Sequence, residues 1–238
     1  MKAEYKTDLA LYELEDKIAS LHFFKEVGRN DRQQLRMLVG QSRLVHAGPG
    51  EVLLKAGDRD SWLYFLMRGE LMVCAPGRMQ RLGRLIAGEV FGDISVITGC
   101  PRKTDILVPP NGREVVVLAL DFRLLSDLQN HTSVSLATKL IVYRQIVHML
   151  RWRSDLYRIK FPRHDLVKKP YRMVQINSGI SAQDELVELG SHARYLAKRL
   201  QYLNEQLGAV DSGAVEKTTQ KAHYDVFLMS ASFKACFG

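Results

Sequence analysis

The spacing of apolar residues divides the chain into regions of different texture. Apolar residues recur at intervals of three and four between Leu11 and Leu21, which predicts an amphipathic helix over residues 8–27, within a first segment of residues 1–30. A second short helix is expected over residues 32–39. These helices precede a stretch with a different pattern.

Short apolar runs separated by glycine and proline occupy residues 44–120. Regular turn residues between short apolar runs are typical of antiparallel sandwiches and barrels. The expected strands are residues 51–55, 62–67, 71–74, 82–86 and 114–120.

After Asp121 the pattern becomes helical, and a stretch without glycine or proline predicts a long helix over residues 131–157. Its apolar residues alternate at spacings of four and three, which is typical of a helix that pairs with another helix. Burial within one chain explains the same spacing, so dimerisation and internal packing both remain open. The five positions of this seam are Leu136, Leu140, Tyr143, Val147 and Leu150.

Prolines and a glycine then interrupt the helix, and the polar, basic residues 158–180 are expected to form a linker. Ser181 and Asp184 have the spacing of a capping box, so a further helix is expected to begin there. It opens a mainly helical C-terminal module, residues 181–238, in which residues 208–238 receive no assignment. The second seam consists of Leu186, Leu189, Ala193, Leu196, Leu200, Leu203 and Leu207.

The composition excludes several classes of protein. With 238 residues, 46% hydrophobic and 25% charged, the chain is expected to fold. The longest aliphatic run, residues 115–120, is far shorter than the roughly 20 residues that a membrane helix needs, and the N-terminus has no apolar signal core, so a cytoplasmic protein is expected. Three distant cysteines offer neither a disulfide framework nor a zinc cluster. No catalytic motif occurs, so we expect no enzyme and no bound metal.

Positive charge is concentrated in the second half of the chain. Residues 1–129 carry 18 basic and 17 acidic residues, whereas residues 130–238 carry 16 and 9. Such a basic stripe suits an anionic partner, which could be DNA, an acidic protein or an anionic membrane surface, although a solvated helix face followed by a basic linker has the same composition. Its members are Lys139, Arg144, Arg151, Arg153, Arg158, Lys160, Arg163, Lys168, Lys169 and Arg172.

The most specific segment is residues 88–105, GEVFGDISVITGCPRKTD. Gly92 allows the backbone to turn, residues 94–97 can form one helical turn with N–H groups available, and Arg102 adds a fixed cation. Backbone N–H groups that face a guanidinium form an anion pocket. An ordinary loop with a surface arginine would have a similar composition.

The surrounding sequence resembles the cyclic nucleotide-binding domain of catabolite-activator-type regulators and of the regulatory subunit of cAMP-dependent protein kinase. This resemblance implies an α+β fold over residues 31–157, in which an antiparallel β jelly-roll barrel is flanked by helices and followed by the long helix. Its elements are Phe23-Phe24, Gly50 with Val52, Gly57-Asp58, Tyr64-Phe65-Leu66, Gly69-Glu70-Leu71, Gly88, Phe91-Gly92-Asp93 and Pro101-Arg102.

The resemblance also implies roles for individual residues. Arg102 would bind the cyclic phosphate, the backbone from Gly92 to Ser95 would donate to its other oxygens, and Asp93 would accept from the ribose 2'-hydroxyl. The family has glutamate in place of Asp93 and a small residue in place of Lys103, which either reinforces the phosphate site or crowds it. His148 would lie near the purine. The implied ligand-binding set is Phe91, Gly92, Asp93, Ile94, Ser95, Arg102, Lys103, Thr104 and His148.

The predicted function is that of a homodimeric cyclic nucleotide sensor that passes ligand binding through the long helix to the C-terminal module. The expected ligand is cAMP, although the residues do not distinguish it from cGMP. One alternative is a DNA-binding regulator with a divergent helix-turn-helix over residues 181–203 and Gly190 at the turn. Its weakness is that Glu185 and Arg199 fall at positions where that motif packs apolar side chains. Another is a scaffold whose barrel binds no nucleotide.

Overall fold

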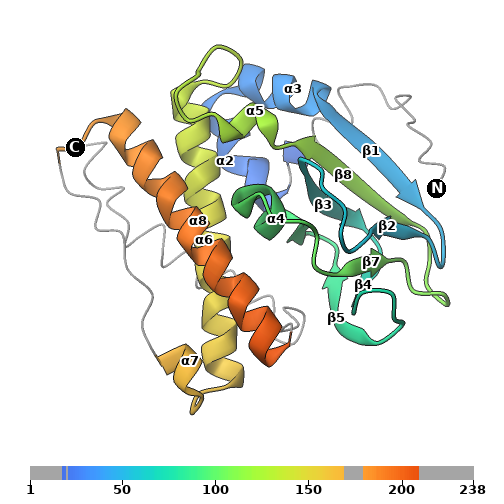
Figure 1. The fold of residues 1–238 in the computed structure, drawn as a ribbon. Helices are drawn as coiled ribbons and strands as arrows, with labels where there is room; N and C mark the ends of the chain where they lie inside the picture. Colours follow the sequence, from blue (N-terminus) through green and yellow to red (C-terminus); the bar gives the residue numbers. More distant parts are fainter. Residues whose placement is uncertain (1–17, 20, 169–178, 209–238) are drawn as a thin grey trace.

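A computed structural model describes residues 18, 19, 21–168 and 179–208. It confirms the α+β class, because two four-stranded antiparallel sheets enclose a barrel and helices pack on one side of it (Figure 1). The strands are β1 (Ser42–Ala47), β2 (Val52–Leu54), β3 (Trp62–Arg68), β4 (Glu70–Cys74), β5 (Arg81–Ile86), β6 (Val90–Phe91), β7 (Asp105–Leu107) and β8 (Val115–Asp121).

The strand order is β1-β8-β3-β6 in one sheet and β2-β7-β4-β5 in the other. The centre of the first sheet is buried on both faces. Leu63 and Phe65 of β3 pack with the helices, while Tyr64 and Leu66 face the inside of the barrel. Because successive side chains of a strand point to opposite faces, a run of apolar residues is what such a strand requires.

The short helices are α2 (His22–Asn30), α3 (Arg32–Gly40), α4 (Asp93–Thr98), α5 (Arg123–Ser126) and α7 (Asp165–Lys168). Asp31 caps α3 by accepting the N–H groups of Gln33 and Gln34. Phe23 and Phe24 of α2 pack on Phe65 with ring centroids 4.9 and 4.8 Å apart, which fixes α2 against the first sheet.

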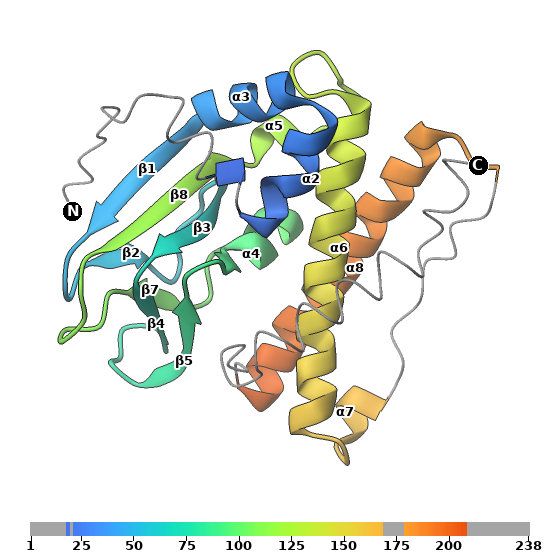
Figure 2. The same ribbon diagram turned by 180° about the vertical axis from the view of Figure 1, so that it is seen from behind.

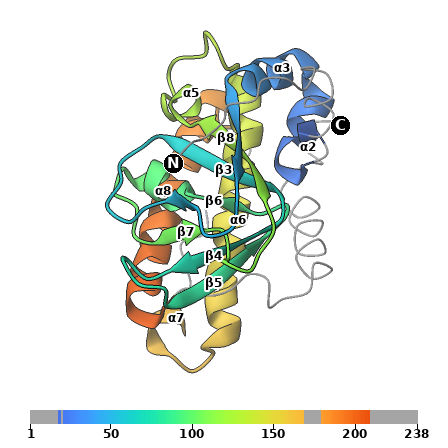
Figure 3. The same ribbon diagram turned by 90° about the vertical axis from the view of Figure 1, so that its right-hand side faces the viewer.

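Two long helices, α6 (Leu136–Lys160) and α8 (Ala182–Leu207), lie side by side next to the barrel, and Figures 2 and 3 show them from behind and from the side. Ser135 caps α6 by accepting the N–H of Thr138, so the helix begins at residue 136. Ser181 caps α8 by accepting the N–H of Asp184, as the capping spacing predicted.

Some predictions lie outside the described residues: most of the helix over residues 8–27, residues 169–178 of the linker predicted over 158–180, and residues 209–238. The described start of that linker is partly helical, because α6 continues to Lys160 and α7 follows. Among the helices that the structure does describe, none combines the length and apolar character needed to span a membrane.

Candidate functional site

The candidate site begins where β6 turns into α4. Gly92 has φ +80°, in the left-handed region that side chains disfavour. A β-carbon there would lie 2.7 Å from Nη1 of Arg102 and 3.2 Å from Cδ2 of Tyr64. Glycine is therefore required at this position both for the turn and for the close approach of the arginine.

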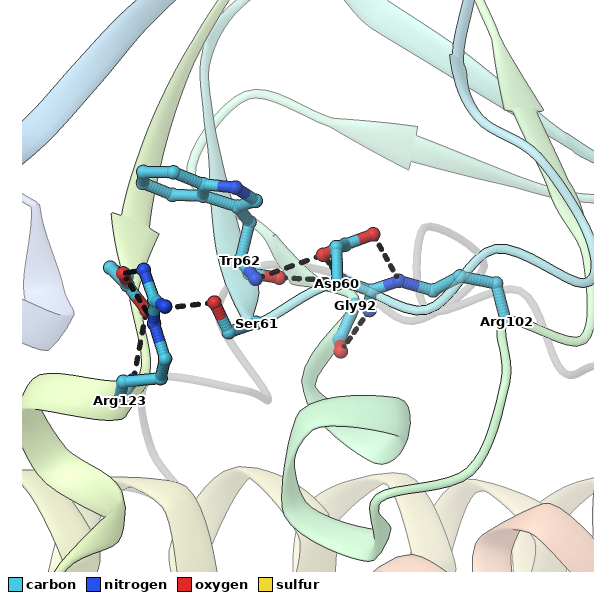
Figure 4. A network of polar contacts seen from close by, with 7 residues as sticks. Asp60, Ser61, Trp62, Gly92, Arg102 and Arg123 are labelled. Carbon is cyan, nitrogen blue, oxygen red and sulfur yellow. Dashed lines mark hydrogen bonds and ion pairs between the residues drawn. The ribbon is translucent and has the colours of Figure 1, made fainter.

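Arg102 is buried and directs its guanidinium back to the start of β3 (Figure 4). Nε donates to Oδ2 of Asp60 at 3.2 Å, and Nη2 donates to the other Asp60 oxygen and, at 2.7 Å, to the carbonyl oxygen of Trp62. Nη1 donates to the carbonyl oxygen of Gly92 at 2.5 Å. The Asp60 carboxylate thus neutralises the cation that the sequence assigned to a ligand phosphate.

Asp93, the first residue of α4, is also buried and paired. Nη1 of Arg153, from α6, donates to both Asp93 oxygens at 2.8 Å, and Nη2 donates to the carbonyl oxygen of Val90 at 2.5 Å. Burial alone would lower the pKa of Arg153, but the Asp93 carboxylate outweighs burial and raises that pKa above its usual range. Asp93, which was predicted to contact a ribose, therefore forms an ion pair with the long helix α6.

Lys103 extends from the same loop to α8, where its amine lies 3.2 Å from the carboxylate of Glu205. A hydrogen bond from Gln201, followed by the one from Lys103, lowers the pKa of Glu205 below its usual value. The pair links the candidate site to the last turn of α8.

The other predicted ligand residues occupy different surroundings. Phe91 stacks on Tyr64 inside the barrel, with ring centroids 5.1 Å apart, whereas Ile94 packs among the helices. Thr104 is half-buried beside β7, and His148 is buried on α6.

A cavity of about 140 Å³ lies next to the Arg102 network, and its walls include Ser95 and Asp60. In the neighbouring network Ser61 donates to Asp121 at 2.8 Å and Arg123 forms an ion pair with it. Burial would raise the pKa of Asp121, but the hydrogen bonds from Arg123 and Ser61 keep it below its usual range. Within the described residues, no cluster of His, Cys, Asp or Glu side chains could hold a metal ion.

The predicted seam of α6 is covered within the chain. Leu140, Tyr143, Val147 and Leu150 are buried, and Leu136 is half-buried, in the apolar cluster that α8 shares. The arrangement is consistent with the internal-packing explanation of the seam, while homodimerisation stays a prediction.

The described members of the basic stripe, residues 139–168, do not form one cationic surface, and Lys169 and Arg172 lie outside the described residues. Lys139 is buried, and its amine donates to the carbonyl oxygens of Asp127 and Asn130 at 2.5 Å. Arg144 forms an ion pair with Glu185 of α8, and Arg153 points to the candidate site. A run of basic residues on a helix points in all directions around its axis, so the charges are dispersed.

The helix-turn-helix alternative is wrong, because α8 continues through Gly190 without a turn. Gly190 serves a different purpose, since a β-carbon there would approach Cδ1 of Leu128 to 2.5 Å. The glycine lets α8 lie close to the residues that precede α6.

Sequence reasoning missed two members of the site, Asp60 and Arg153. Asp60 lies two residues before the apolar strand β3, in an exposed polar segment where an acidic residue is common. Arg153 was counted only as part of the basic stripe. Arg153 lies three residues after Leu150, the last residue of the predicted seam, and this position gave no sign that its side chain turns toward the barrel.

Comparisons with known proteins agree with this geometry over the barrel. Residues 44–128 match the family model described as the cyclic nucleotide-binding domain. This segment contains Asp60, Gly92 and Arg102 and ends before α6. The predicted resemblance is therefore confirmed for the barrel.

Two curated relatives cover a similar part of the chain. A cGMP-dependent protein kinase, isozyme 1, of Drosophila melanogaster is 27% identical over 126 residues, 50% of this chain and 16% of the relative. A cyclic nucleotide-gated potassium channel of Rhizobium etli is 29% identical over 85 residues, 36% of this chain and 22% of the relative. The chain thus matches less than a quarter of either relative's length.

Among solved structures, a cyclic nucleotide-binding domain from Methylobacillus flagellatus is 20% identical with a TM-score of 0.46, covering 69% of this chain and 86% of that one. The regulatory domain of Toxoplasma gondii PKA with cAMP is 16% identical with a TM-score of 0.42, covering 52% and 46%.

Proposed function

Starting from a barrel that matches the cyclic nucleotide-binding domain family, we propose that this chain is a non-enzymatic regulatory protein that senses a cyclic nucleotide, with cAMP as the first ligand to test. One observation carries the proposal: the buried guanidinium of Arg102 lies against the left-handed Gly92 at the start of α4. A fixed cation beside the first turn of a short helix suits a phosphate diester.

Binding would require an exchange of partners at Arg102. A ligand phosphate carries one negative charge and competes with the Asp60 carboxylate, whose side chain is 25% exposed and can be hydrated once released. A charge-assisted hydrogen bond contributes about 1.5–3 kcal/mol net. Arg102 should therefore dominate the affinity, although Asp60 reduces the gain.

The signal would leave the barrel through Asp93. A ribose hydroxyl that donates to this carboxylate shares it with Arg153, and Arg153 belongs to α6. A ligand can shift the equilibrium between two positions of a helix only as far as it binds one of the two resulting conformations more tightly than the other. We propose the Asp93–Arg153 pair as the contact at which that difference arises, and α8 as the element that receives it.

A second candidate function is an assembly scaffold that binds no nucleotide. One observation favours it: four hydrogen bonds to Asp60, Gly92 and Trp62 already use most of the five N–H groups of Arg102. The barrel would then keep its fold with the cation permanently neutralised.

Calorimetric titration with cAMP and then cGMP separates the two candidates. The full chain should bind one of them saturably, and Arg102→Ala should weaken binding about 10- to 100-fold, which corresponds to the 1.5–3 kcal/mol above. Arg78→Ala removes an equal charge from an exposed hairpin and should bind as the unaltered chain does. Absence of heat with both nucleotides, or equal binding by Arg102→Ala, would reject the sensor and favour the scaffold.

A further inference from the structure

The two long helices run in the same general direction, cross at an oblique angle and contact each other (Figure 1). Toward the beginning of this contact, Arg144, the ninth residue of α6, donates to Glu185 in the first turn of α8 at 2.8 and 2.6 Å. Near their ends, the Tyr157 hydroxyl bonds to Asn204 and, at 2.8 Å, to the carbonyl oxygen of Gly208. Polar contacts therefore fix the register of the pair at both ends.

The contact between these ends is apolar and close. Gly190, in the third turn of α8, allows an approach in which its missing β-carbon would lie 3.7 Å from the ring of Tyr143. Six apolar residues of α8 at the spacing of a helix-pairing seam are each no more than 4% exposed: Leu186, Leu189, Ala193, Leu196, Leu200 and Leu203.

We propose that α8 occupies, within the same chain, the face of α6 that would otherwise pair with a second copy of this protein. The α6 seam was predicted from its spacing alone, and spacing does not say whether the partner helix comes from another chain. Here a helix of nearly equal length covers Tyr143, Val147 and Leu150. One face cannot hold two helices, so the chain is a monomer while α8 is docked.

The same docking places α8 on the candidate site. Its middle packs on α4, and Glu205 holds Lys103. This arrangement makes α8 the element that decides whether the α6 face is available to a second copy. The inference concerns the folded chain and does not require that a nucleotide binds, so it stands or falls separately from the proposed function.

The Lys103–Glu205 pair supplies a test in the unaltered full chain. A zero-length carbodiimide joins an amine to a carboxylate in contact, and the two groups lie 3.2 Å apart. We expect light scattering to give the monomer mass of 27.1 kDa, and the Lys103–Glu205 cross-linked peptide to come from the monomer band of a denaturing gel. A dimer mass, the peptide in the dimer band, or no such peptide would overturn the proposal.

A charge exchange tests the register and provides a matched control. Arg144→Glu places two acids together at the start of the helix pair and should lower the yield of the Lys103–Glu205 cross-link several-fold and produce some dimer. Combining it with Glu185→Arg restores an opposite pair between the same positions. The double variant should recover the monomer and the cross-link. If it behaves like Arg144→Glu alone while both remain helical by circular dichroism, Glu185 is not the partner and the proposal fails.

Discussion

Replacing Arg153 with methionine should destabilise the fold by leaving a carboxylate buried without its cation. The Asp93 side chain is 3% exposed, whereas that of Arg153 is 24% exposed. Removing one partner of a buried ion pair typically lowers the free energy of unfolding by about 3–5 kcal/mol. The residual exposure of Arg153 places the expected loss at about 3 kcal/mol. Methionine keeps much of the apolar stem, so the lost charge dominates.

Thermal and urea denaturation would measure this loss in the unaltered chain, Arg153→Met, Asp93→Asn and the variant that combines both changes. For a chain of this size, about 3 kcal/mol corresponds to a fall in Tm of about 6–12 °C. Asp93→Asn keeps the shape of the side chain and leaves the more exposed Arg153 unpaired, so it should lower the free energy of unfolding by only about 1–2 kcal/mol. The double variant should lose less than the sum of the two, with a coupling of about 2 kcal/mol.

Arg163→Met, an exposed arginine just beyond α6, is the matched control and should change the free energy of unfolding by less than about 0.5 kcal/mol. The reasoning is refuted if Arg153→Met loses no more than this control. It is also refuted if the effects of the two single variants add in the double variant, because Asp93 and Arg153 would then not act on each other.

Two further predictions concern backbone strain and alkaline pH. Gly92→Ala should abolish nucleotide binding in calorimetry, because its β-carbon would displace Arg102; Gly77→Ala, also at positive φ but with open space around it, should bind normally. Burial raises the pKa of Tyr143 from 10 to about 12. The stability that this tyrosine provides is present below pH 10 and lost as the pH rises through about 12. In an ultraviolet titration, Tyr143→Phe should lose one tyrosine from those that ionise late, and an unchanged curve would contradict the burial.

The barrel could be predicted from the sequence because its strands are short and separated by turn residues. The central strands β3 and β8 are buried on both faces, and their unbroken apolar runs are visible without knowledge of their neighbours. The order in which the strands pair could not be predicted, because it depends on contacts between segments that are distant in the sequence.

The site was only partly predictable. Gly92 and Arg102 stand in a segment whose local sequence is distinctive, and the structure brings them together. The partners of the charged residues come from elsewhere in the chain: Asp60 from 42 residues before Arg102, and Arg153 from 60 residues after Asp93. Such pairs require the tertiary fold, because a single sequence carries no signal that joins them.

In the C-terminal half of the chain, the number of basic residues is a poor guide to the positive charge on the surface. A surplus of basic residues predicted a surface for an anionic partner, yet Lys139 is buried under backbone carbonyls and Arg144 is paired with Glu185. A carbonyl oxygen neutralises part of a buried ammonium without adding a charge to the sequence. Net charge along the chain therefore overstates the positive surface that remains.

The loop from α4 to β7, taken here as residues 92–104, has three charged residues, and each is held by a different part of the molecule. Asp60, before β3, holds Arg102; α6 holds Asp93 through Arg153; and α8 holds Lys103 through Glu205. An anion that binds this loop competes with Asp60 for the arginine and changes the charge that the other two pairs experience. Because those pairs belong to the two long helices, the proposed ligand binding would alter the forces that keep α6 and α8 against the barrel. A loop built for binding alone would not need partners on both helices.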